Sequence, residues 1–166
     1  MQYLLVGLPF AGKTTLAKEL EKRFGFVRLS VDDVKFELGY SGVGDDDVPD
    51  EAWEKIFRVL DARIVENLKA DKTVLTEYAW VTKQWRDRAR KLAGEMGVET
   101  KIIFVNTPED VVRRRRLENR DVNARFDIPD TVFEEALHDF EPPTKDENII
   151  MYDRAEKLDV WTKENF

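Results

Sequence analysis

Apolar residues in this chain occur in two patterns that alternate along its length. Short continuous apolar runs, bounded by polar or turn-forming residues, predict buried β-strands. These runs cover residues 2–6, 26–29, 73–76, 98–105 and 148–152. Longer stretches in which apolar residues recur every three or four positions predict amphipathic helices. They cover residues 13–24, 50–68, 82–96 and 129–140, and the residues after 152 are predicted to form a polar tail.

Two further helices are predicted from their start signals. Ser30-Val-Asp-Asp33 fits a capping box, in which Ser30 and an acid three residues later satisfy the first free amides of a helix. Thr107-Pro-Glu-Asp110 combines a capping residue, a proline at the first helical position and acids in the first turn. Residues 40–49, with two glycines and three consecutive aspartates, are predicted to be a solvated loop.

Strands that alternate with helices in this way predict βαβ units, and therefore a parallel sheet in an α/β protein. Right-handed crossovers place helices on both faces of such a sheet, which gives three layers. Ligands bind parallel sheets at the carboxyl ends of the strands. We therefore expect residues 7–14, 30–33, 76–80 and 106–108 to line one cleft in a single domain that spans residues 1–166.

Composition fits one globular domain, because the chain has 166 residues, of which 42% are apolar and 37% charged. The formal net charge of −7 disfavours a nucleic-acid partner, without excluding one, and argues against a membrane partner. No apolar run approaches the roughly 18 residues of a membrane span. The first residues lack the basic region of a signal peptide, and the absence of cysteine excludes disulfides and thiolate metal sites. These features favour a cytoplasmic location.

The segment between the first predicted strand and the first predicted helix has the spacing Gly7-x4-Gly12-Lys13-Thr14. This spacing matches a phosphate-binding loop, or P-loop, in its expected strand-to-helix context. Glycines let successive backbone N–H groups turn toward a phosphate, and the helix N-terminus adds free donors. Lys13 is expected to reach the β and γ phosphates, and the Thr14 hydroxyl to ligate magnesium. The predicted cofactor-binding residues are Gly7, Leu8, Pro9, Phe10, Ala11, Gly12, Lys13, Thr14 and Thr15.

Four segments together resemble a known family. They are GLPFAGKTTLAKEL, LSVDDVK, NTPEDVVRRRRLENR and FEPPTKDE, and they extend over most of the chain. The sequence is similar to the small P-loop kinases grouped with the kinase half of phage polynucleotide kinase, the zeta toxins and chloramphenicol phosphotransferase. The resemblance implies a P-loop NTPase fold with a five-stranded parallel sheet and a helical lid, here around residues 113–128. It also implies magnesium, ATP and phosphoryl transfer to a hydroxyl.

Asp32 and Asp33 follow the second predicted strand. Phosphoryl transfer needs a base that accepts the hydroxyl proton or holds the hydroxyl in line. Asp33 has a structural explanation, because it completes the capping box with Ser30. Asp32 has none, and the resemblance to polynucleotide kinase places the catalytic base there. Lys35 aligns with a basic residue on the acceptor side of that family, and a solvated helix lysine explains it nearly as well.

The densest positive patch of the chain runs from Arg113 to Arg116 and continues at Arg120 and Arg125. Arginines on a closing lid can stabilise the negative charge that develops during phosphoryl transfer. Arg116 and Arg120 lie one helical turn apart and share a face, so we predict that these two are catalytic. The alternatives are a solvated helix face, which must account for some of the run, and an RNA-binding patch.

Glu77 directly follows the third predicted strand, at the position where many P-loop enzymes have an aspartate that holds magnesium through water. Glu77 is therefore predicted to be a metal residue, with acceptor binding or a turn cap as alternatives. Tyr78 and Trp80 follow at once. They fit the wall of an acceptor pocket, although packing in the core explains each of them more simply.

Taken together, these features predict an ATP-dependent phosphotransferase with a small-molecule or nucleotide hydroxyl as acceptor. Its catalytic residues would be Lys13, Asp32, Arg116 and Arg120. One alternative is a polynucleotide 5′-hydroxyl kinase, which a net charge of −7 disfavours. Another is a nucleotide-gated switch without catalysis, in which closure of the arginine lid changes a protein surface.

Overall fold

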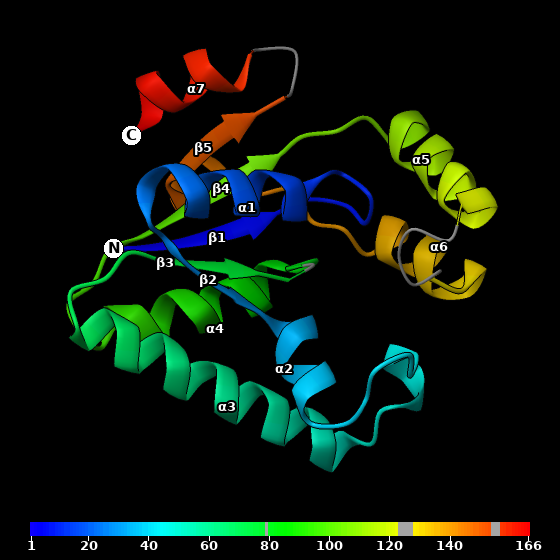
Figure 1. The fold of residues 1–166 in the computed structure, drawn as a ribbon, viewed down its shortest axis with the longest axis horizontal. Helices are drawn as coiled ribbons and strands as arrows, with labels where there is room; N and C mark the ends of the chain where they lie inside the picture. The colour runs from blue at the N-terminus through cyan, green and yellow to red at the C-terminus, as the bar shows by residue number, and fades with distance from the viewer. Residues whose placement is uncertain (79, 123–127, 154–156) are drawn as a thin grey trace.

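The computed structural model describes residues 1–78, 80–122, 128–153 and 157–166. Within these residues, five parallel strands form one sheet in the order β2-β3-β1-β4-β5 (Figure 1). The strands are β1 (Gln2–Val6), β2 (Val27–Ser30), β3 (Val74–Glu77), β4 (Thr100–Val105) and β5 (Ile149–Tyr152). This sheet confirms the predicted α/β fold with a five-stranded parallel sheet.

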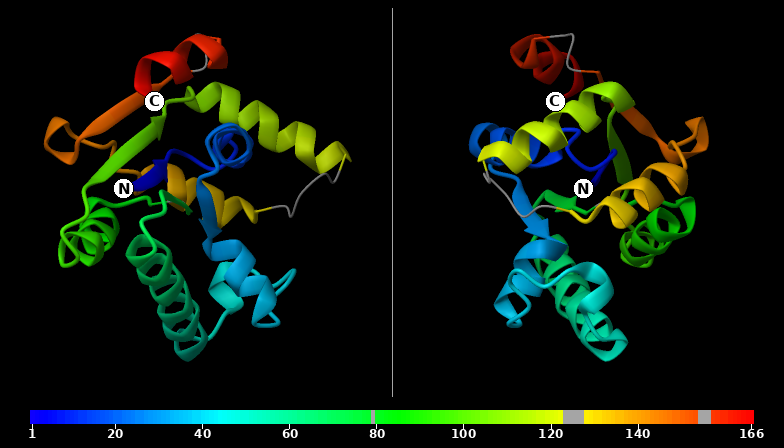
Figure 2. Two further views of the ribbon diagram at one scale, coloured as in Figure 1. Left: turned by 60° about the vertical axis from the view of Figure 1, so that its left-hand side comes forward. Right: turned by 90° about the vertical axis from the view of Figure 1, so that its right-hand side faces the viewer.

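Helices cover both faces of the sheet, which gives the predicted three layers (Figures 1 and 2). The helices are α1 (Lys13–Phe24), α2 (Val31–Glu37), α3 (Asp50–Lys69), α4 (Lys83–Gly94), α5 (Glu109–Val122), α6 (Asp130–His138) and α7 (Leu158–Asn165). Helices α1 and α7 pack on one face of the sheet, and α3 and α4 pack on the other.

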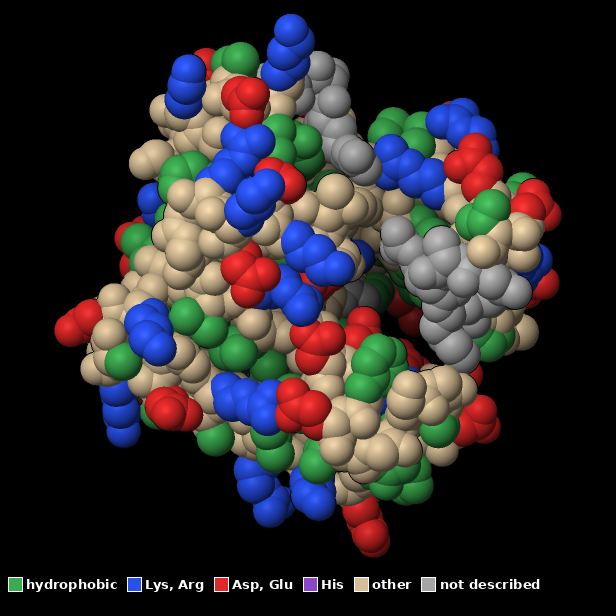
Figure 3. Space-filling model, in the orientation of Figure 1, with side chains coloured by type: hydrophobic (Ala, Val, Ile, Leu, Met, Phe, Trp, Pro, Cys, Tyr) green, Lys and Arg blue, Asp and Glu red, His purple; other side chains and the backbone are tan. Residues whose placement is uncertain are grey.

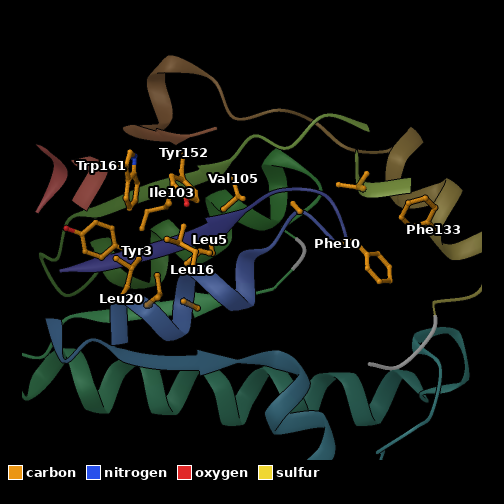
Figure 4. Close-up of a cluster of buried hydrophobic side chains, with 14 residues drawn as sticks. Tyr3, Leu5, Phe10, Leu16, Leu20, Ile103, Val105, Phe133, Tyr152 and Trp161 are labelled. Atoms are coloured by element: carbon orange, nitrogen blue, oxygen red, sulfur yellow. The ribbon is translucent and has the colours of Figure 1, made fainter. Parts of the chain in front are cut away.

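Strand β1 lies at the centre of the sheet and is buried on both faces, as a parallel sheet between two helix layers requires. Successive side chains of a strand point to opposite faces. Leu5 therefore joins the cluster that contains Leu16 of α1 and Trp161 of α7 (Figure 4). Leu4 joins a second cluster on the opposite face, together with Ile102 of the neighbouring strand β4. This burial fixes the position of the loop that follows β1.

The C-terminal residues differ from the predicted polar tail, because they form helix α7. Its Trp161 is only 3% exposed, and its ring lies 4.8 Å from the ring of Tyr152. The indole N–H of Trp161 also donates a hydrogen bond of 2.6 Å to the Met151 carbonyl. The helix is eight residues long and mostly polar, so tertiary packing stabilises it more than its own apolar pattern does.

Helices α5 and α6 project beyond the carboxyl ends of the strands (Figure 1). The α2 helix and the loop after it extend past the same end of the sheet. The space-filling view shows a hollow between these two parts of the molecule, with Asp and Glu side chains along its lower rim (Figure 3). The predicted lid around residues 113–128 falls on α5 and the segment after it, and Arg125 lies outside the described residues.

Candidate functional site

The P-loop joins the end of β1 to the start of α1 and has a backbone that only particular residues allow. Gly7 has φ of 154°, and a Cβ atom placed on it would lie 2.7 Å from the carbonyl oxygen of Val105. Gly12 precedes α1 in the left-handed region, with φ of 102°. Both glycines of the motif are therefore required by the path of the chain.

Lys13 extends back over the loop from the first position of α1. Its Nζ donates hydrogen bonds to the carbonyl oxygens of Gly7, at 2.8 Å, and Leu8, at 2.9 Å. These bonds hold the ammonium group beside the backbone that would surround a phosphate. The sequence-predicted residues 7–15 thus form one continuous loop and helix N-terminus, as the motif requires.

The outer side of the P-loop is attached to the segment around α5. The Thr107 hydroxyl donates to the Ala11 carbonyl at 2.9 Å, and Arg115 Nη1 donates to the carbonyls of Phe10 and Ala11, each at 3.2 Å. The Phe10 ring is buried 6.1 Å from the ring of Phe133 in α6. These contacts fix the conformation of the loop and connect it to both α5 and α6.

Arg116 and Arg120, the predicted lid arginines, lie on a different side of α5 from the P-loop contact. Both bind the Asp130 carboxylate at the start of α6, each at 2.7 Å. Arg116 is also buried, and its guanidinium lies 4.5 Å from the centre of the Phe133 ring. Adjacent residues of a helix point about 100° apart, which is why Arg115 reaches the P-loop and Arg116 does not. Arg116 and Arg120 do share a face of α5, but in this structure that face binds Asp130 of α6.

Glu77 ends β3 beside the P-loop and is only 8% exposed. One of its carboxylate oxygens accepts a hydrogen bond from the Thr14 hydroxyl. The other accepts a bond of 3.0 Å from Arg28 of β2. A hydroxyl and a carboxylate in contact are the oxygen donors that magnesium prefers, so these residues fit the metal that the resemblance implies. The Glu77 side chain therefore binds Thr14 and Arg28, and within the described residues it does not cap a turn as one alternative proposed.

Arg28 is a site residue that the sequence analysis missed. Its Nη2 binds the Asp33 carboxylate at 2.7 Å, while its Nη1 binds Glu77. The Asp33 amide donates to the Ser30 hydroxyl at 3.5 Å, so half of the predicted capping box is present. The Asp33 carboxylate, however, neutralises Arg28. Only the pairing of β2 with β3 brings these residues together, and a single arginine in a strand gives no sequence signal.

Asp32 is different from Asp33, because it is exposed and, within the described residues, its carboxylate makes no hydrogen bond or ion pair. Although the residue reaches solvent, its pKa is raised above the usual range, first because neighbouring protein atoms displace part of its hydration. The carboxylate of Asp45 raises it further, and Lys35 acts in the opposite direction. The Glu77 carboxylate also raises the pKa of Asp32.

Lys35 is not a solvated helix lysine, since it is only 4% exposed. Its Nζ donates 2.6 Å bonds to the Val43 carbonyl and the Asp45 carboxylate, and it lies 5.7 Å from the centre of a Trp53 ring. The acidic loop predicted to be solvated is therefore attached to α2 through Asp45. This attachment keeps the Asp45 carboxylate near Asp32.

Tyr78 and Trp80 have different environments, although they are close in sequence. Trp80 is 1% exposed and packs in the core with its ring 5.7 Å from that of Tyr78. Tyr78 is half-buried, and its pKa is raised, mainly by burial and also by the carboxylates of Asp45 and Asp32. Trp80 thus contacts Tyr78 from the core, and Tyr78 remains partly open to solvent.

A buried ion pair between Arg86 and Glu147 supports the residues that follow β3. Arg86 and Glu147 have side chains that are both 0% exposed and form a paired contact of 2.7 and 3.0 Å. Arg86 also donates to the carbonyls of Trp80, at 3.1 Å, and Glu141, at 2.9 Å. The Glu141 carboxylate accepts from the Lys83 amide at the start of α4. The FEPPTKDE segment therefore anchors α4 and the residues that follow β3.

A comparison with protein families matches residues 3–143 to a family described as an AAA domain (AAA_33). The chain belongs to this AAA domain family. A comparison with curated proteins finds no match. In the described residues, no helix has the length and apolar character of a membrane span.

Solved structures show the same fold at low sequence identity. A sugar kinase from Janibacter sp. HTCC2649 has a TM-score of 0.70 and 16% identity, over 98% of this chain and 90% of that chain. Kti12 from Chaetomium thermophilum, solved with ADP-AlF3, has a TM-score of 0.74 and 20% identity, over 98% and 94%. The APS kinase of Mycobacterium tuberculosis, solved with AMPPNP and APS, has a TM-score of 0.64 and 18% identity, over 98% and 93%. These matches confirm the P-loop NTPase fold that the sequence predicted.

Proposed function

We propose that this protein is an ATP-dependent kinase that transfers the γ-phosphoryl group of ATP to a hydroxyl of a small molecule. The observation that carries the proposal is the Asp32 carboxylate. It is exposed and follows β2 at the same edge of the parallel sheet as the P-loop, and its pKa is raised in part by the Glu77 carboxylate that contacts Thr14. A nucleotide-gated switch, which transfers no phosphoryl group, has no role for a carboxylate at this position.

The binding residues would act as follows. Lys13 and the loop amides hold the phosphates, with Lys13 giving up its bonds to the loop carbonyls. Thr14 and Glu77 hold magnesium, which when bound offsets negative charge on the β and γ oxygens. Arg115 of α5 already binds the carbonyls of the P-loop and would stay beside it. Arg116 and Arg120 would have to leave Asp130 to reach the phosphates.

In the transfer itself, the acceptor oxygen bonds to the γ-phosphorus while the bond from that phosphorus to the β–γ bridging oxygen breaks, which releases ADP. Asp32 accepts the hydroxyl proton or orients the hydroxyl. A raised pKa suits a base, since proton affinity increases with pKa. The sugar kinase and the APS kinase among the solved structures, and the nucleotide complexes of the APS kinase and of Kti12, support this proposal at the level of the fold.

The test measures transfer of label from γ-labelled ATP, with magnesium, to a panel of hydroxyl compounds. We expect Lys13→Ala to abolish turnover and Asp32→Asn to keep ATP binding while transfer falls by about a hundred-fold or more. Asp71→Asn is the matched control, because Asp71 is exposed, lies between α3 and β3, and has a positive φ that asparagine tolerates. Full transfer by Asp32→Asn would contradict the assignment.

A nucleotide-gated switch is the second candidate, favoured by the contacts that join the P-loop to α6 through Phe10 and Phe133. It predicts that AMPPNP changes amide hydrogen exchange in α6 and that no hydroxyl compound in the panel is phosphorylated. A 5′-hydroxyl oligonucleotide in the same panel tests the polynucleotide alternative.

A further inference from the structure

A groove between the first half of α3 and the start of α4 contains three aromatic rings in a row. The Trp53 and Phe57 rings are 5.9 Å apart, and the Phe57 and Trp85 rings are 5.2 Å apart with only 17° between their planes. Trp85 is 41% exposed. The groove is lined by Asp50, Trp53, Glu54, Phe57, Arg58, Asp61, Trp85 and Arg88. A row of near-parallel rings that is open to solvent is a surface on which a further planar ring can stack.

Two residues that line this groove contact residues of the candidate active site. The Phe57 ring lies 6.0 Å from the ring of Tyr78, the residue that follows Glu77. The Trp53 indole N–H donates to the Asp45 carbonyl at 3.3 Å, and the Asp45 carboxylate acts on Asp32. Trp53 and Phe57, which line the groove, therefore also contact Asp45 and Tyr78, whose surroundings include the proposed base Asp32.

The charges around the groove disfavour an anionic ligand. Asp50 and Glu54 line it, and Arg88 is paired with Asp61 at 2.5 Å while it lies over the Phe57 ring. Arg58 is the remaining basic residue of the lining. Asp32 and Asp45 add negative charge toward the P-loop. A ligand with phosphate groups would meet net repulsion here, whereas an uncharged or cationic ring would not.

We propose that this aromatic groove is the part of the acceptor site that holds a planar ring. The acceptor is then an uncharged or cationic hydroxyl compound that carries an aromatic or heteroaromatic ring. The inference rests on the proposed function, since it names the acceptor class of the same kinase site. Cytidine is a suitable probe, because it combines a planar ring with hydroxyls and has no charge at neutral pH.

The experiment compares cytidine with ribose, which has hydroxyls but no aromatic ring, and with CMP, which adds a phosphate. We expect transfer to cytidine at a KM at least about ten-fold lower than for ribose, as stacking of one ring provides. Because the phosphate of CMP blocks the 5′-hydroxyl, CMP is compared by binding, and we expect it to quench Trp85 emission less than cytidine does. Trp85→Ala raises the KM for cytidine about ten-fold and leaves kcat and the KM for ribose unchanged, whereas Trp85→Phe keeps the low KM.

Val160→Ala is the control, because Val160 is 45% exposed on α7, which packs on the opposite face of the sheet from α3 and α4. Equal KM values for cytidine and ribose, or an equal effect of Trp85→Ala on both, would overturn the inference. So would preferential phosphorylation of a single-stranded oligonucleotide, because that acceptor is polyanionic.

A binding measurement separates this inference from the proposed function. The emission of Trp85, taken as the difference between the native protein and Trp85→Phe, is quenched by cytidine but not by ribose if the groove binds a ring. Quenching without any phosphoryl transfer would contradict the kinase proposal and retain the ring site. Transfer to ribose-like acceptors without quenching would retain the kinase and refute the ring site.

Discussion

Replacing Arg86 by methionine tests the claim that a buried ion pair supports the residues that follow β3 in the candidate active site. Methionine keeps much of the side-chain length but removes the charge and the donors. Glu147 would then remain 0% exposed with no cation, and the carbonyls of Trp80 and Glu141 would each lose their Arg86 donor. Breaking a buried pair in this way costs about 3–5 kcal/mol of unfolding free energy.

The effect on thermal stability follows from the size of the chain. For a domain of this length, about 1 kcal/mol lowers the melting temperature by roughly 2–4 °C, so Arg86→Met should lower it by roughly 6–20 °C. Arg63→Met is the control, because the Arg63 and Glu37 side chains are 37% and 53% exposed. An exposed pair contributes less than about 1 kcal/mol.

The same variant also has a predicted pH dependence. Burial would raise the pKa of Glu147, but hydrogen bonds from Arg86 and the Thr144 backbone outweigh it, so the pKa is lowered. A lowered folded-state pKa means that this stabilisation is present above the unfolded pKa, about 4.3, and is lost as the pH falls through the folded value. Without Arg86, burial raises the pKa of Glu147, so the stability difference from the native protein should be larger at pH 7 than at pH 4.

Chemical denaturation at pH 7 and pH 4, together with thermal melting, measures both effects. A loss below about 1 kcal/mol at pH 7 would show that water or a rearranged neighbour replaces Arg86 easily. A loss that is the same at both pH values would show that the charge of Glu147 is not what Arg86 stabilises.

Three further predictions concern the site. Gly7→Ala should abolish ATP binding in an equilibrium titration and lower stability by about 1–3 kcal/mol, because its Cβ would lie 2.7 Å from a backbone oxygen; unchanged ATP affinity would contradict the loop geometry. Arg115→Ala should weaken ATP binding by about ten-fold, because its bonds to the P-loop carbonyls are lost. Arg116→Ala should mainly lower the melting temperature, and the reverse pattern would restore Arg116 as the nucleotide-binding arginine. Asp45→Asn should shift the acidic limb of kcat/KM to lower pH, because the Asp45 charge raises the pKa of Asp32; an unchanged limb would mean that Asp32 is not the titrating base.

The sequence alone was sufficient for the features that depend on neighbours along the chain. The P-loop and α1 were predicted to the residue, because glycine spacing and helical periodicity are local properties. The buried strands and the parallel sheet followed from the alternation of apolar runs with helices. The position of Glu77 at the end of β3, beside the P-loop, followed from the same topology.

The remaining features were decided by tertiary structure, because they join residues that are distant in sequence. Arg28 reaches Glu77 only because β2 pairs with β3, and Arg86 reaches Glu147 only because the last part of the chain returns to α4. Arg115 contacts the P-loop and Arg116 does not, because packing sets the rotation of α5 about its axis. A run of four arginines gives no sequence signal for that rotation. Helix α7 forms for the same reason: its own pattern is weak, and the burial of Trp161 against β5 supplies the stability that its sequence lacks.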